Sequence, residues 1–304
     1  MNKPDLVVIL GPTASGKTRL AVRLAHELKS AVISGDSRQV YKDMNIGTGK
    51  DLNEYTYNGQ PIPYYLIDIK DAGERYNISE FQRDFSTVYQ QLHSVGKLSV
   101  LCGGTGLYIE SILKDFQYTS IPVNEALRAR LISKSKEELL AIHQQTPSAY
   151  SALADISTSK RLIRAIEIGT YLQSNEHKNE PNAKINTILF GIDVSRDVRR
   201  QRISTRLEQR LNSGMIEEVK DLLNKGISVE DIIYYGLEYK FITLYLLGEL
   251  SYDELSNRLE NAICQFAKRQ MTYFRKMERD GFTINWINGE LPIDEQLKVL
   301  LSHL

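Results

Sequence analysis

The chain has 304 residues, of which 42% are hydrophobic and 25% charged, so the composition excludes a mainly disordered protein and predicts one large or two smaller packed domains. Acidic and basic residues balance at 38 each, so net charge alone gives no argument for nucleic-acid binding, although a balanced sum can hide a positive face. Two cysteines, Cys102 and Cys264, exclude a disulfide scaffold, and no Cys/His spacing suggests zinc.

The sequence carries no recognisable targeting or membrane signal. The apolar run before Gly11 is too short for a signal peptide, and no run approaches the length of a membrane span. The last four residues carry no lipidation signal. We therefore expect a cytoplasmic protein with no membrane partner.

Short apolar runs alternate with helical patterns along the first third of the chain, as a parallel βαβ sheet requires. The runs predict strands at 6–10, 31–34, 64–69 and 98–102. Helical patterns at 17–28 and 79–95 lie between them.

From residue 116 to 181 the strand signal disappears and helical patterns dominate. An apolar run at 188–194 predicts a return to the sheet and its last strand. Further helices are predicted at 195–212, 215–224, 242–247 and 253–279.

This order of elements predicts an α/β fold, a parallel sheet flanked by helices with an all-helical insertion. We place the sheet domain at 1–117 and 188–304, together with the C-terminal helices. The helical insertion takes 118–187 and ends in a polar segment at 174–183.

A glycine-rich loop between the first strand and the first helix is the strongest motif. Residues 11–18 read GPTASGKT and match GxxxxGK[ST] without a mismatch. Glycines let successive backbone N–H groups point at a diphosphate, a lysine contacts its oxygens, and a threonine hydroxyl can bind Mg²⁺. The motif predicts a P-loop NTPase-like sheet and a diphosphate site made of Gly11, Pro12, Thr13, Ala14, Ser15, Gly16, Lys17 and Thr18, with Thr18 as the metal ligand.

The motif does not identify the phosphorylated ligand. A nucleotide hydrolase or kinase is the default, and it needs an aspartate at the end of a later strand to hold the metal through water. Asp68 could serve, but the strand at 98–102 ends in GGTG without an acid, and no NKxD-like segment is present. A motor-type NTPase is therefore disfavoured.

Polar residues also follow the strand at 31–34. Asp36 would repel a diphosphate, so it suits accepting a proton, binding the metal, or binding a donor on a second substrate. The alternative is a residue that caps a turn. Ser37, Arg38 and Gln39 supply donors and acceptors suited to a polar heterocycle.

Thr105 lies among three glycines after the strand at 98–102. The glycines allow a ligand to approach the backbone closely, with Thr105 aimed at it. A plain tight turn is the alternative.

Four arginines recur at spacings of three and four on one helix face. They are Arg199, Arg202, Arg206 and Arg210. Arg202 and Arg206 flank the apolar seam of this helix and could hold a leaving diphosphate through bidentate contacts. A solvated face is the alternative, above all for Arg199 and Arg210.

Two further helices carry basic rows. One row is formed by Lys160, Arg161 and Arg164, and the C-terminal helix carries Lys268, Arg269, Arg275, Lys276 and Arg279 with Tyr273 and Phe274 between them. Any single cluster is usually solvated surface. Three clusters in a chain of zero net charge favour a polyanionic partner such as RNA.

Taken together, these segments resemble the tRNA dimethylallyltransferase family. The matching stretches are GPTASGKT at 11–18, DSRQVYKDMNIGTGK at 36–50, LIDI at 66–69, GGTGLY at 103–108, KRLIRAIEI at 160–168, the RIxxR and GMIEEV segments around 202–219, and AKRQMTYFRK at 267–276. They cover nearly the whole chain in the family's order.

The resemblance implies a reaction and its partners. A dimethylallyl group would pass from dimethylallyl diphosphate to N6 of adenosine 37 in tRNAs that read codons beginning with U. Mg²⁺ would be the cofactor, and the anticodon stem-loop would be clamped between core and insertion. We expect a monomer.

The resemblance also implies roles for individual residues. Asp36 would be the general base and Thr105 a residue of the reaction channel, while Lys17 and either Arg202 or Arg206 would contact the diphosphate. The implied tRNA contacts are Asp36, Ser37, Arg38, Gln39, Thr105, Arg128, Lys160, Arg161, Leu162, Ile163, Arg164, Lys268, Arg269 and Arg275.

The chain departs from the family pattern at several positions. Asn45 stands where aspartate is usual, and residues 49–51 read GKD instead of Ala-Lys-Pro. Tyrosines replace frequent histidines at 64–65. Residues 236–240 read GLEYK instead of a compact Gly-Tyr-Lys or Gly-Tyr-Arg, which leaves the role of 234–240 open.

Other function classes share parts of the pattern. An enzyme that prenylates a free adenine nucleotide would need the same loop, but the insertion and the basic C-terminal helix would be superfluous. A small-molecule kinase would turn over ATP without RNA. A non-catalytic nucleotide switch would leave Asp36 and Thr105 without a purpose.

Overall fold

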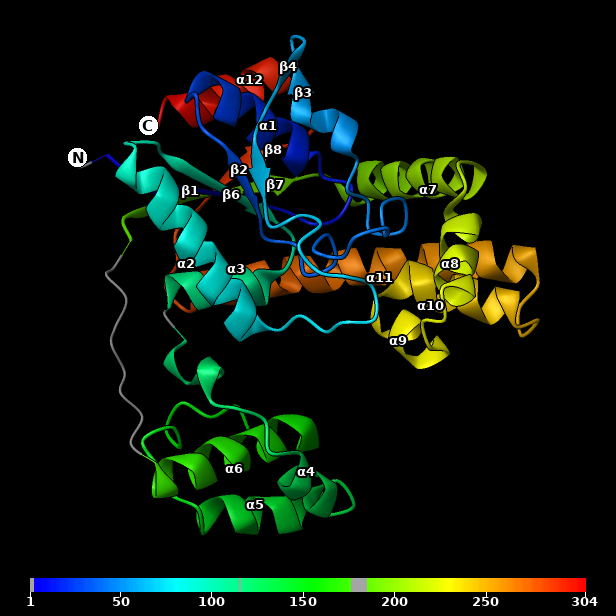
Figure 1. The fold of residues 1–304 in the computed structure, drawn as a ribbon. Helices are drawn as coiled ribbons and strands as arrows, with labels where there is room; N and C mark the ends of the chain where they lie inside the picture. Colours follow the sequence, from blue (N-terminus) through cyan, green and yellow to red (C-terminus); the bar gives the residue numbers. More distant parts are fainter. Residues whose placement is uncertain (1–2, 115, 176–184) are drawn as a thin grey trace. The chain divides into compact units, whose positions relative to one another are not determined.

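Among the described residues, six parallel strands form the main sheet (Figure 1). The computed structural model describes residues 3–114, 116–175 and 185–304. The strands lie in the order β5-β2-β6-β1-β7-β8, and each neighbouring pair is parallel. Their bounds are β1 Leu6–Leu10, β2 Val32–Ser34, β5 Tyr64–Tyr65, β6 Ser99–Gly103, β7 Thr187–Asp193 and β8 Ile284–Asn288.

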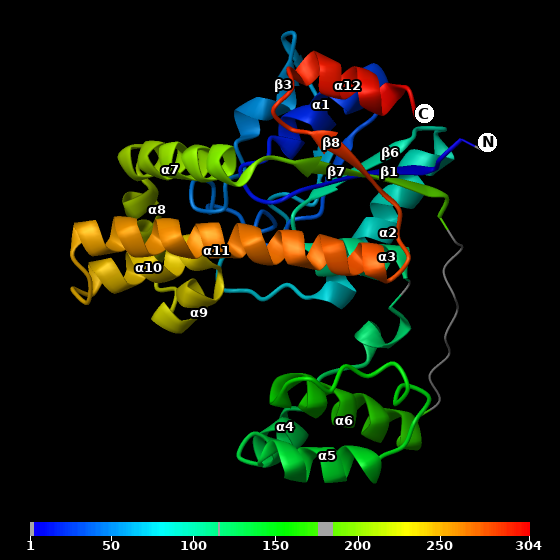
Figure 2. The ribbon, with the colours of Figure 1, turned by 180° about the vertical axis from the view of Figure 1, so that it is seen from behind.

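Strand β1 lies in the middle of the sheet because its side chains are all apolar. It pairs with β6 on one side and β7 on the other, and none of its residues is exposed. A parallel strand covered on both faces needs such a continuous apolar run. Val7 and Ile9 belong to one apolar cluster with helices α1 (Lys17–Glu27) and α12 (Ile293–Leu301), whereas Leu6, Val8 and Leu10 belong to another with α2 (Ile78–Ser94), α3 (Gly106–Leu113) and α11 (Tyr252–Arg279). Figure 2 shows α1 and α12 on one side of the sheet and α2, α3 and α11 on the other.

Helices cover both faces of the sheet. Their bounds are α1 Lys17–Glu27, α2 Ile78–Ser94, α3 Gly106–Leu113, α7 Arg196–Asn212, α8 Met215–Asn224, α9 Val229–Tyr234, α10 Leu237–Leu246, α11 Tyr252–Arg279 and α12 Ile293–Leu301. Short elements after β2 are the 3₁₀ turn Leu52–Tyr55 and the hairpin of β3 Thr56–Tyr57 and β4 Gln60–Pro61. The long helix α11 packs against α3, α7 and α10.

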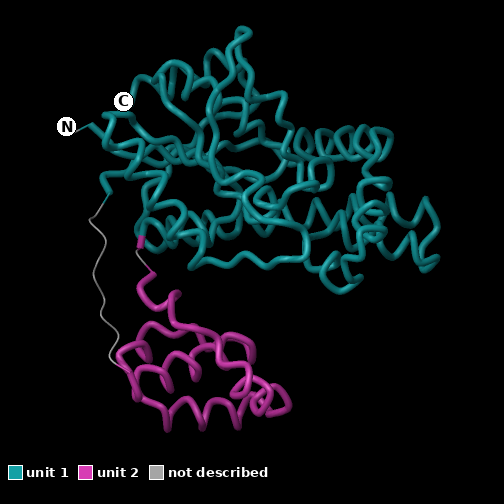
Figure 3. Tube along the Cα trace, viewed as in Figure 1, with its two compact units in different colours: residues 1–113, 184–304 teal, residues 114–183 magenta. Residues whose placement is uncertain are grey.

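Contacts divide the chain into two units, 1–113 with 184–304, and Lys114–Ala183 (Figure 3). The second unit holds α4 Glu125–Leu131, α5 Lys136–Gln144 and α6 Ser159–Ser174, preceded by the 3₁₀ turn Gln117–Ser120. Its apolar core is formed by Leu131, Leu139, Leu162 and Ile166. The unit begins and ends slightly earlier than the predicted range 118–187. Beyond Asn175, the predicted polar segment at 174–183 lies outside the described residues.

Two predictions about the sheet are wrong. The pattern predicts a strand at 64–69, but β5 ends at Tyr65, because Leu66 and Asp68 adopt left-handed backbone angles (φ 62° and 57°) and Asp68 forms an ion pair with the buried Lys50. The run at 188–194 does form β7, but β7 is not the last strand, since β8 adds alongside it.

Several elements lack a clear sequence signal. The β8 sequence INWIN carries two asparagines and is too short to stand out. Helices α9 and α12 were not predicted, and 242–247 covers only the second half of α10. Helix α2 begins at Ile78, because Asn77 forms a capping box with Glu80.

Within the described residues, no helix is both long enough and apolar enough to cross a membrane.

The pairing of β7 with β8 gives the first prediction. Gly191 is the register partner of Trp286, and a Cβ at Gly191 would lie 2.5 Å from the indole ring. Gly191→Ala should therefore destabilise the protein by about 1–3 kcal/mol, the usual cost of overpacking. Urea unfolding measures this loss. In a Trp286→Leu background the penalty should shrink, and an equal penalty in both backgrounds would show that the ring is not the obstacle.

Candidate active site

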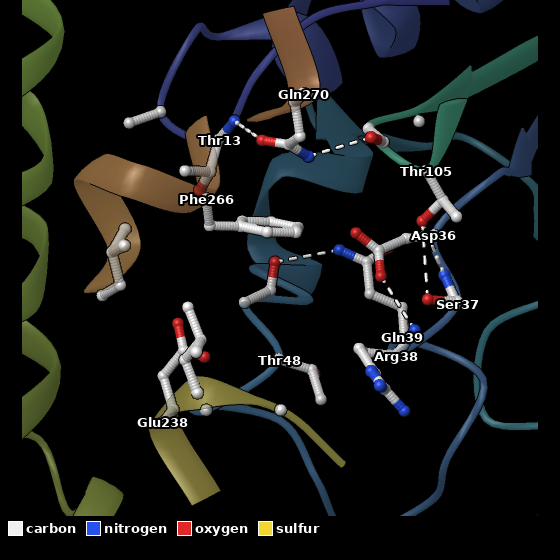
Figure 4. Close-up of a pocket in the computed structure, with 18 of the residues that line it drawn as sticks. Thr13, Asp36, Ser37, Arg38, Gln39, Thr48, Thr105, Glu238, Phe266 and Gln270 are labelled. Atoms are coloured by element: carbon white, nitrogen blue, oxygen red, sulfur yellow. Dashed lines mark hydrogen bonds between the residues drawn. The ribbon is translucent and has the colours of Figure 1, made fainter. Parts of the chain in front are cut away.

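A cavity of about 780 Å³ opens where β1, β2 and β6 end (Figure 4). Three loops that follow these strands line it, at 11–18, 36–39 and 103–107. Residues within 47–55, arginines of α7, residues 233–240 and one face of α11 also line it. Ligands of open parallel sheets bind at this edge, beyond the carboxyl ends of the strands.

The phosphate loop lies between β1 and α1, as predicted. Gly16 precedes the helix with φ 88°, and Ala14 has φ 61°, so the backbone turns tightly at the loop tip. A Cβ at Gly11 would lie 2.7 Å from the Ser15 hydroxyl, which explains the glycine there. The N–H groups of the first turn of α1 have no helical acceptor and form an anion site.

Lys17 extends from this turn into the cavity. Its ammonium donates a hydrogen bond to the carbonyl of Pro12 over 3.4 Å. Burial lowers the pKa of Lys17, while the nearby carboxylate of Asp36 opposes that shift. An anion bound in the loop would favour the charged ammonium, so Lys17 is suited to hold a diphosphate.

Asp36 lies at the end of β2 and is half-buried. One carboxylate oxygen accepts a hydrogen bond from the backbone N–H of Arg38 over 2.8 Å, so Asp36 does cap a turn. The backbone N–H of Asp36 donates to the hydroxyl of Ser34. The turn and the capacity to accept a proton are compatible, because in the described part of the chain no hydrogen bond reaches the second oxygen.

Thr105 faces the same turn from the neighbouring strand. Its hydroxyl accepts a hydrogen bond from the backbone N–H of Ser37 over 3.2 Å. Gln39 donates to the carbonyl of Gly49 and accepts from the hydroxyl of Ser34. The structure therefore brings Asp36, Ser37, Gln39 and Thr105 together beside the phosphate loop (Figure 4).

Arg38 lies on the outer side of this group. Its guanidinium stacks on the ring of Tyr234 at 5.0 Å, and Arg75 approaches the same ring at 4.8 Å. Tyr234 itself lines the cavity.

Three arginines of α7 line the cavity. Arg202 donates to the carbonyl of Gly289 over 3.1 Å. Arg206 and Arg210 share the carboxylate of Asp51, at 2.6 Å and 3.3 Å. Burial of Asp51 raises its pKa, but the two guanidinium groups outweigh this effect and the pKa lies below its ordinary value.

Arg210 was assigned to a solvated face among the alternatives above, and the structure contradicts that. Its side chain is only 14% exposed. The pKa of Arg210 is lowered by burial and by the charge of Arg206. Gly49 makes room for the pair, since a Cβ there would collide with both guanidinium groups.

Other polar groups in the wall had no predicted role. Burial raises the pKa of Glu54 and Glu238, so each takes up a proton more readily than an exposed carboxylate. Burial also raises the pKa of the Cys102 thiol to about 12, which makes it unsuited as a nucleophile. Glu238 belongs to the atypical 236–240 segment, and the unusual sequence there was the available signal.

Gln270 was also missed, although it lies in the predicted segment 267–276. It is 8% exposed and bonds both the phosphate loop and the loop after β6. The signal was a polar residue within the apolar stripe of α11, between Ala267 and Phe274. Phe274, grouped above with the basic surface residues, is instead fully buried.

The remaining predicted RNA contacts fall into two groups. On α11, Lys268, Arg269 and Arg275 are exposed, and Arg269 also lines the cavity. The other group belongs to the helical unit, where Lys160 and Arg161 are exposed. These residues present positive charge to solvent and are available to a polyanion.

Within the helical unit, the other predicted contacts serve its own packing. Arg128 and Arg164 form ion pairs with the buried Glu167 at 2.8 Å and 3.4 Å. Leu162 is completely buried in the apolar core, and Ile163 packs against that core. Leu162 therefore has no side-chain surface to offer to RNA.

Asp68, the alternative metal-binding acid, is not part of the cavity wall. Its carboxylate accepts a hydrogen bond from the buried ammonium of Lys50. This ion pair holds the loop after β5 and occupies the Asp68 carboxylate. Asp68 is therefore unsuited to be the metal-binding acid that a nucleotide hydrolase needs.

Comparisons with known proteins cover the whole chain. Residues 39–277 match the IPP transferase family, and residues 4–68 match the isopentenyl transferase family. Proteins named tRNA dimethylallyltransferase 2 from Bacteroides fragilis and Phocaeicola vulgatus are 52% and 53% identical, over 99% and 100% of this chain. The matches cover 98% and 99% of those two relatives.

Solved structures agree with this similarity. A full-length tRNA isopentenylpyrophosphate transferase from Bacillus halodurans is 32% identical with a TM-score of 0.71, over 99% of this chain and 95% of its own. A eukaryotic dimethylallyltransferase acting on tRNA has a TM-score of 0.77, over 93% of this chain and 73% of its own. At 22% identity, the eukaryotic structure shows the fold alone.

The shared carboxylate of Asp51 gives the second prediction. Asp51→Asn leaves Arg206 and Arg210 beside each other without the carboxylate that pairs with both, so the melting temperature should fall, on the order of 2–4 °C for each kcal/mol lost. Inorganic pyrophosphate should raise the melting temperature of the variant more than that of the wild type, because the anion replaces the missing charge.

Differential scanning fluorimetry with and without pyrophosphate measures both effects. Asp71→Asn removes an exposed ion pair with Lys42 and serves as the matched control, with little change expected. Equal pyrophosphate shifts in wild type and Asp51→Asn would show that the arginine pair takes no part in diphosphate binding.

Proposed function

The chain belongs to the IPP transferase family, and from this premise we propose that it transfers a dimethylallyl group from dimethylallyl diphosphate to N6 of adenosine 37 in tRNAs that read codons beginning with U. The observation that carries the proposal is the position of Asp36 and Thr105 beside the phosphate loop in one cavity. A carboxylate beside a diphosphate loop suits a proton acceptor for a second substrate better than a phosphate ligand.

The diphosphate end of the donor would bind in the loop at 11–18. An exocyclic adenine amine is a weak nucleophile because its lone pair is delocalised into the ring, so the enzyme must make the leaving group better. Lys17, the loop N–H groups and Arg206 would stabilise the negative charge that develops on departing pyrophosphate. Arg202 stays a second candidate for this contact, since it lines the same cavity.

The transfer replaces one bond to C1 of the allyl group with another. The bond between C1 of the allyl group and the diphosphate oxygen breaks, and pyrophosphate keeps the electron pair. N6 forms a bond to C1, and Asp36 takes the N6 proton at the carboxylate oxygen that is not used in the turn. Thr105 would line the channel between donor and acceptor, because its hydroxyl is held against the Ser37 backbone.

Magnesium belongs to the proposal. Thr18 belongs to the phosphate loop and lines the cavity, as do the acidic residues Asp36 and Glu54. In the described part of the chain, no three acidic, histidine or cysteine side chains form a complete metal site. Mg²⁺ is usually bound through one or two protein oxygens together with substrate phosphates and water, and the Thr18 hydroxyl would supply the protein oxygen. When bound, the ion would neutralise charge on the diphosphate.

For tRNA we propose contacts from three groups of residues. They are the cavity residues Asp36, Ser37, Arg38, Gln39 and Thr105, the exposed Lys160 and Arg161 of the helical unit, and Lys268, Arg269 and Arg275 of α11. The target adenine in an anticodon loop is already unpaired, so extruding it costs only stacking, a few kcal/mol. A cytoplasmic location and a monomeric state complete the proposal.

The third prediction separates tRNA from the alternative acceptors. The protein is incubated with Mg²⁺, labelled dimethylallyl diphosphate and either unmodified tRNA or adenosine monophosphate, and the label is followed into the acceptor. We expect label in tRNA only, because the basic rows of α6 and α11 suit a polyanion. Label in the free nucleotide would identify an adenylate prenyltransferase. ATP turnover without RNA would identify a kinase.

The fourth prediction tests the base. Asp36→Asn keeps an oxygen to accept the Arg38 N–H but cannot take up a proton, so the turn should survive while turnover falls by about 10²–10⁴-fold. Inorganic pyrophosphate should bind with nearly unchanged affinity. Single-turnover transfer to tRNA and calorimetry with pyrophosphate measure the two quantities. Wild-type turnover in the variant would exclude Asp36 as the base.

A further inference from the structure

The carboxamide of Gln270 connects the two loops between which the reaction takes place. Its oxygen accepts a hydrogen bond from the backbone N–H of Thr13 over 2.8 Å, and its nitrogen donates to the carbonyl of Gly104 over 2.9 Å (Figure 4). Thr13 belongs to the phosphate loop and Gly104 precedes Thr105. The N–H of Thr13 can only donate and the carbonyl of Gly104 can only accept, so a single orientation of the amide satisfies both bonds.

The surroundings of Gln270 hold this amide in place. The residue is 8% exposed on the inner face of α11, and Tyr273 lies one turn further along the same face. A Cβ at Gly104 would collide with the Gln270 amide nitrogen, and a Cβ at Gly106 would collide with the Tyr273 ring. The glycine-rich loop after β6 therefore lies directly against α11, and the absence of side chains at 104 and 106 is what permits this approach.

A chain of hydrogen bonds runs from the phosphate loop to the acceptor side. Thr13 bonds Gln270, Gln270 bonds Gly104, and Thr105 accepts from the backbone of Ser37, which follows Asp36. The N–H of Thr13 is consequently used by the protein and is not offered to a phosphate. Buried amide bonds of this kind are directional, so the carboxamide defines the distance between the two loops.

We propose that Gln270 is a positioning residue that sets the spacing between the diphosphate of the donor and the amine of the acceptor. The inference rests on the proposed function, since it takes loop 11–18 as the donor site and Asp36 with Thr105 as the acceptor side. Transfer requires C1 and N6 to lie about 3–3.5 Å apart in a suitable orientation, and a misplacement of about 1 Å can cost 10²-fold in rate. Gln270 contacts neither reacting atom and acts through Thr13 and Thr105.

Gln270→Met tests the proposal, because methionine has a similar length and makes neither hydrogen bond. We expect the single-turnover rate at saturating dimethylallyl diphosphate and tRNA to fall by up to about 10²-fold. The dissociation constants for inorganic pyrophosphate and for tRNA should stay close to wild type, since each loop keeps its own binding groups. Gly104→Ala pushes the amide away from the opposite side and should give the same division between rate and binding.

The matched control is Gln296→Met. Gln296 is a buried glutamine on α12 with a hydrogen bond to the carbonyl of Leu291, and it does not line the cavity. This variant should lose stability without a change in single-turnover rate. A double-mutant cycle of Gln270→Met with Thr105→Val should be non-additive, because both substitutions interrupt the same chain of bonds.

Different outcomes would overturn the proposed function or only the positioning role of Gln270. Wild-type protein that transfers no dimethylallyl group would overturn the proposed function and this inference together. Wild-type transfer with an unchanged rate in Gln270→Met or Gly104→Ala would overturn the inference alone. If Gln270→Met lost only affinity for pyrophosphate, Gln270 would merely support the phosphate loop. That result would also overturn the inference.

Discussion

The hydrogen bonds that pair β1, β2 and β6 bring three distant segments of the chain to one edge of the sheet. Because these strands are parallel, their carboxyl ends coincide, and each loop that follows carries its polar groups into the same cavity. The continuous apolar run of β1 is what permits this arrangement, since a central strand must be buried on both faces. The site therefore depends on a strand that contributes no functional side chain of its own.

Helix α11 adds a second constraint from outside the sheet. Its apolar stripe packs on the core, and the polar Gln270 within that stripe satisfies one backbone group in each of two loops. The ring of Tyr273 packs against Gly106 in the loop after β6. A buried polar side chain is costly unless both of its ends are bonded, so this position specifies one arrangement of the loops. The exposed face of the same helix presents Lys268, Arg269 and Arg275 to solvent.

The charged side chains that line the cavity also influence one another. Lys17 of the phosphate loop and the arginines of α7 line the same cavity, and Asp51 offsets part of the repulsion between Arg206 and Arg210. Glu54 and Glu238 are buried enough that their pKa values are raised. The zero net charge of the whole chain therefore conceals a cavity lined by more basic than acidic residues. Asp51 pairs with the two arginines, and Glu238 of the 236–240 segment also lies within reach of their charge.

Local signals in the sequence determined the parallel sheet, the loop at 11–18 and the helical insertion, because alternating patterns and glycine spacing depend on neighbours along the chain. The short strand β8, the truncated β5 and helix α9 were decided by tertiary contacts such as the Lys50–Asp68 pair, which no local pattern records. The positions of Asp36 and Thr105 could also be predicted, because each residue follows the carboxyl end of a predicted strand. The roles of Gln270, Arg210 and Asp51 did not, because each depends on a partner more than 150 residues away that only folding brings within hydrogen-bond distance.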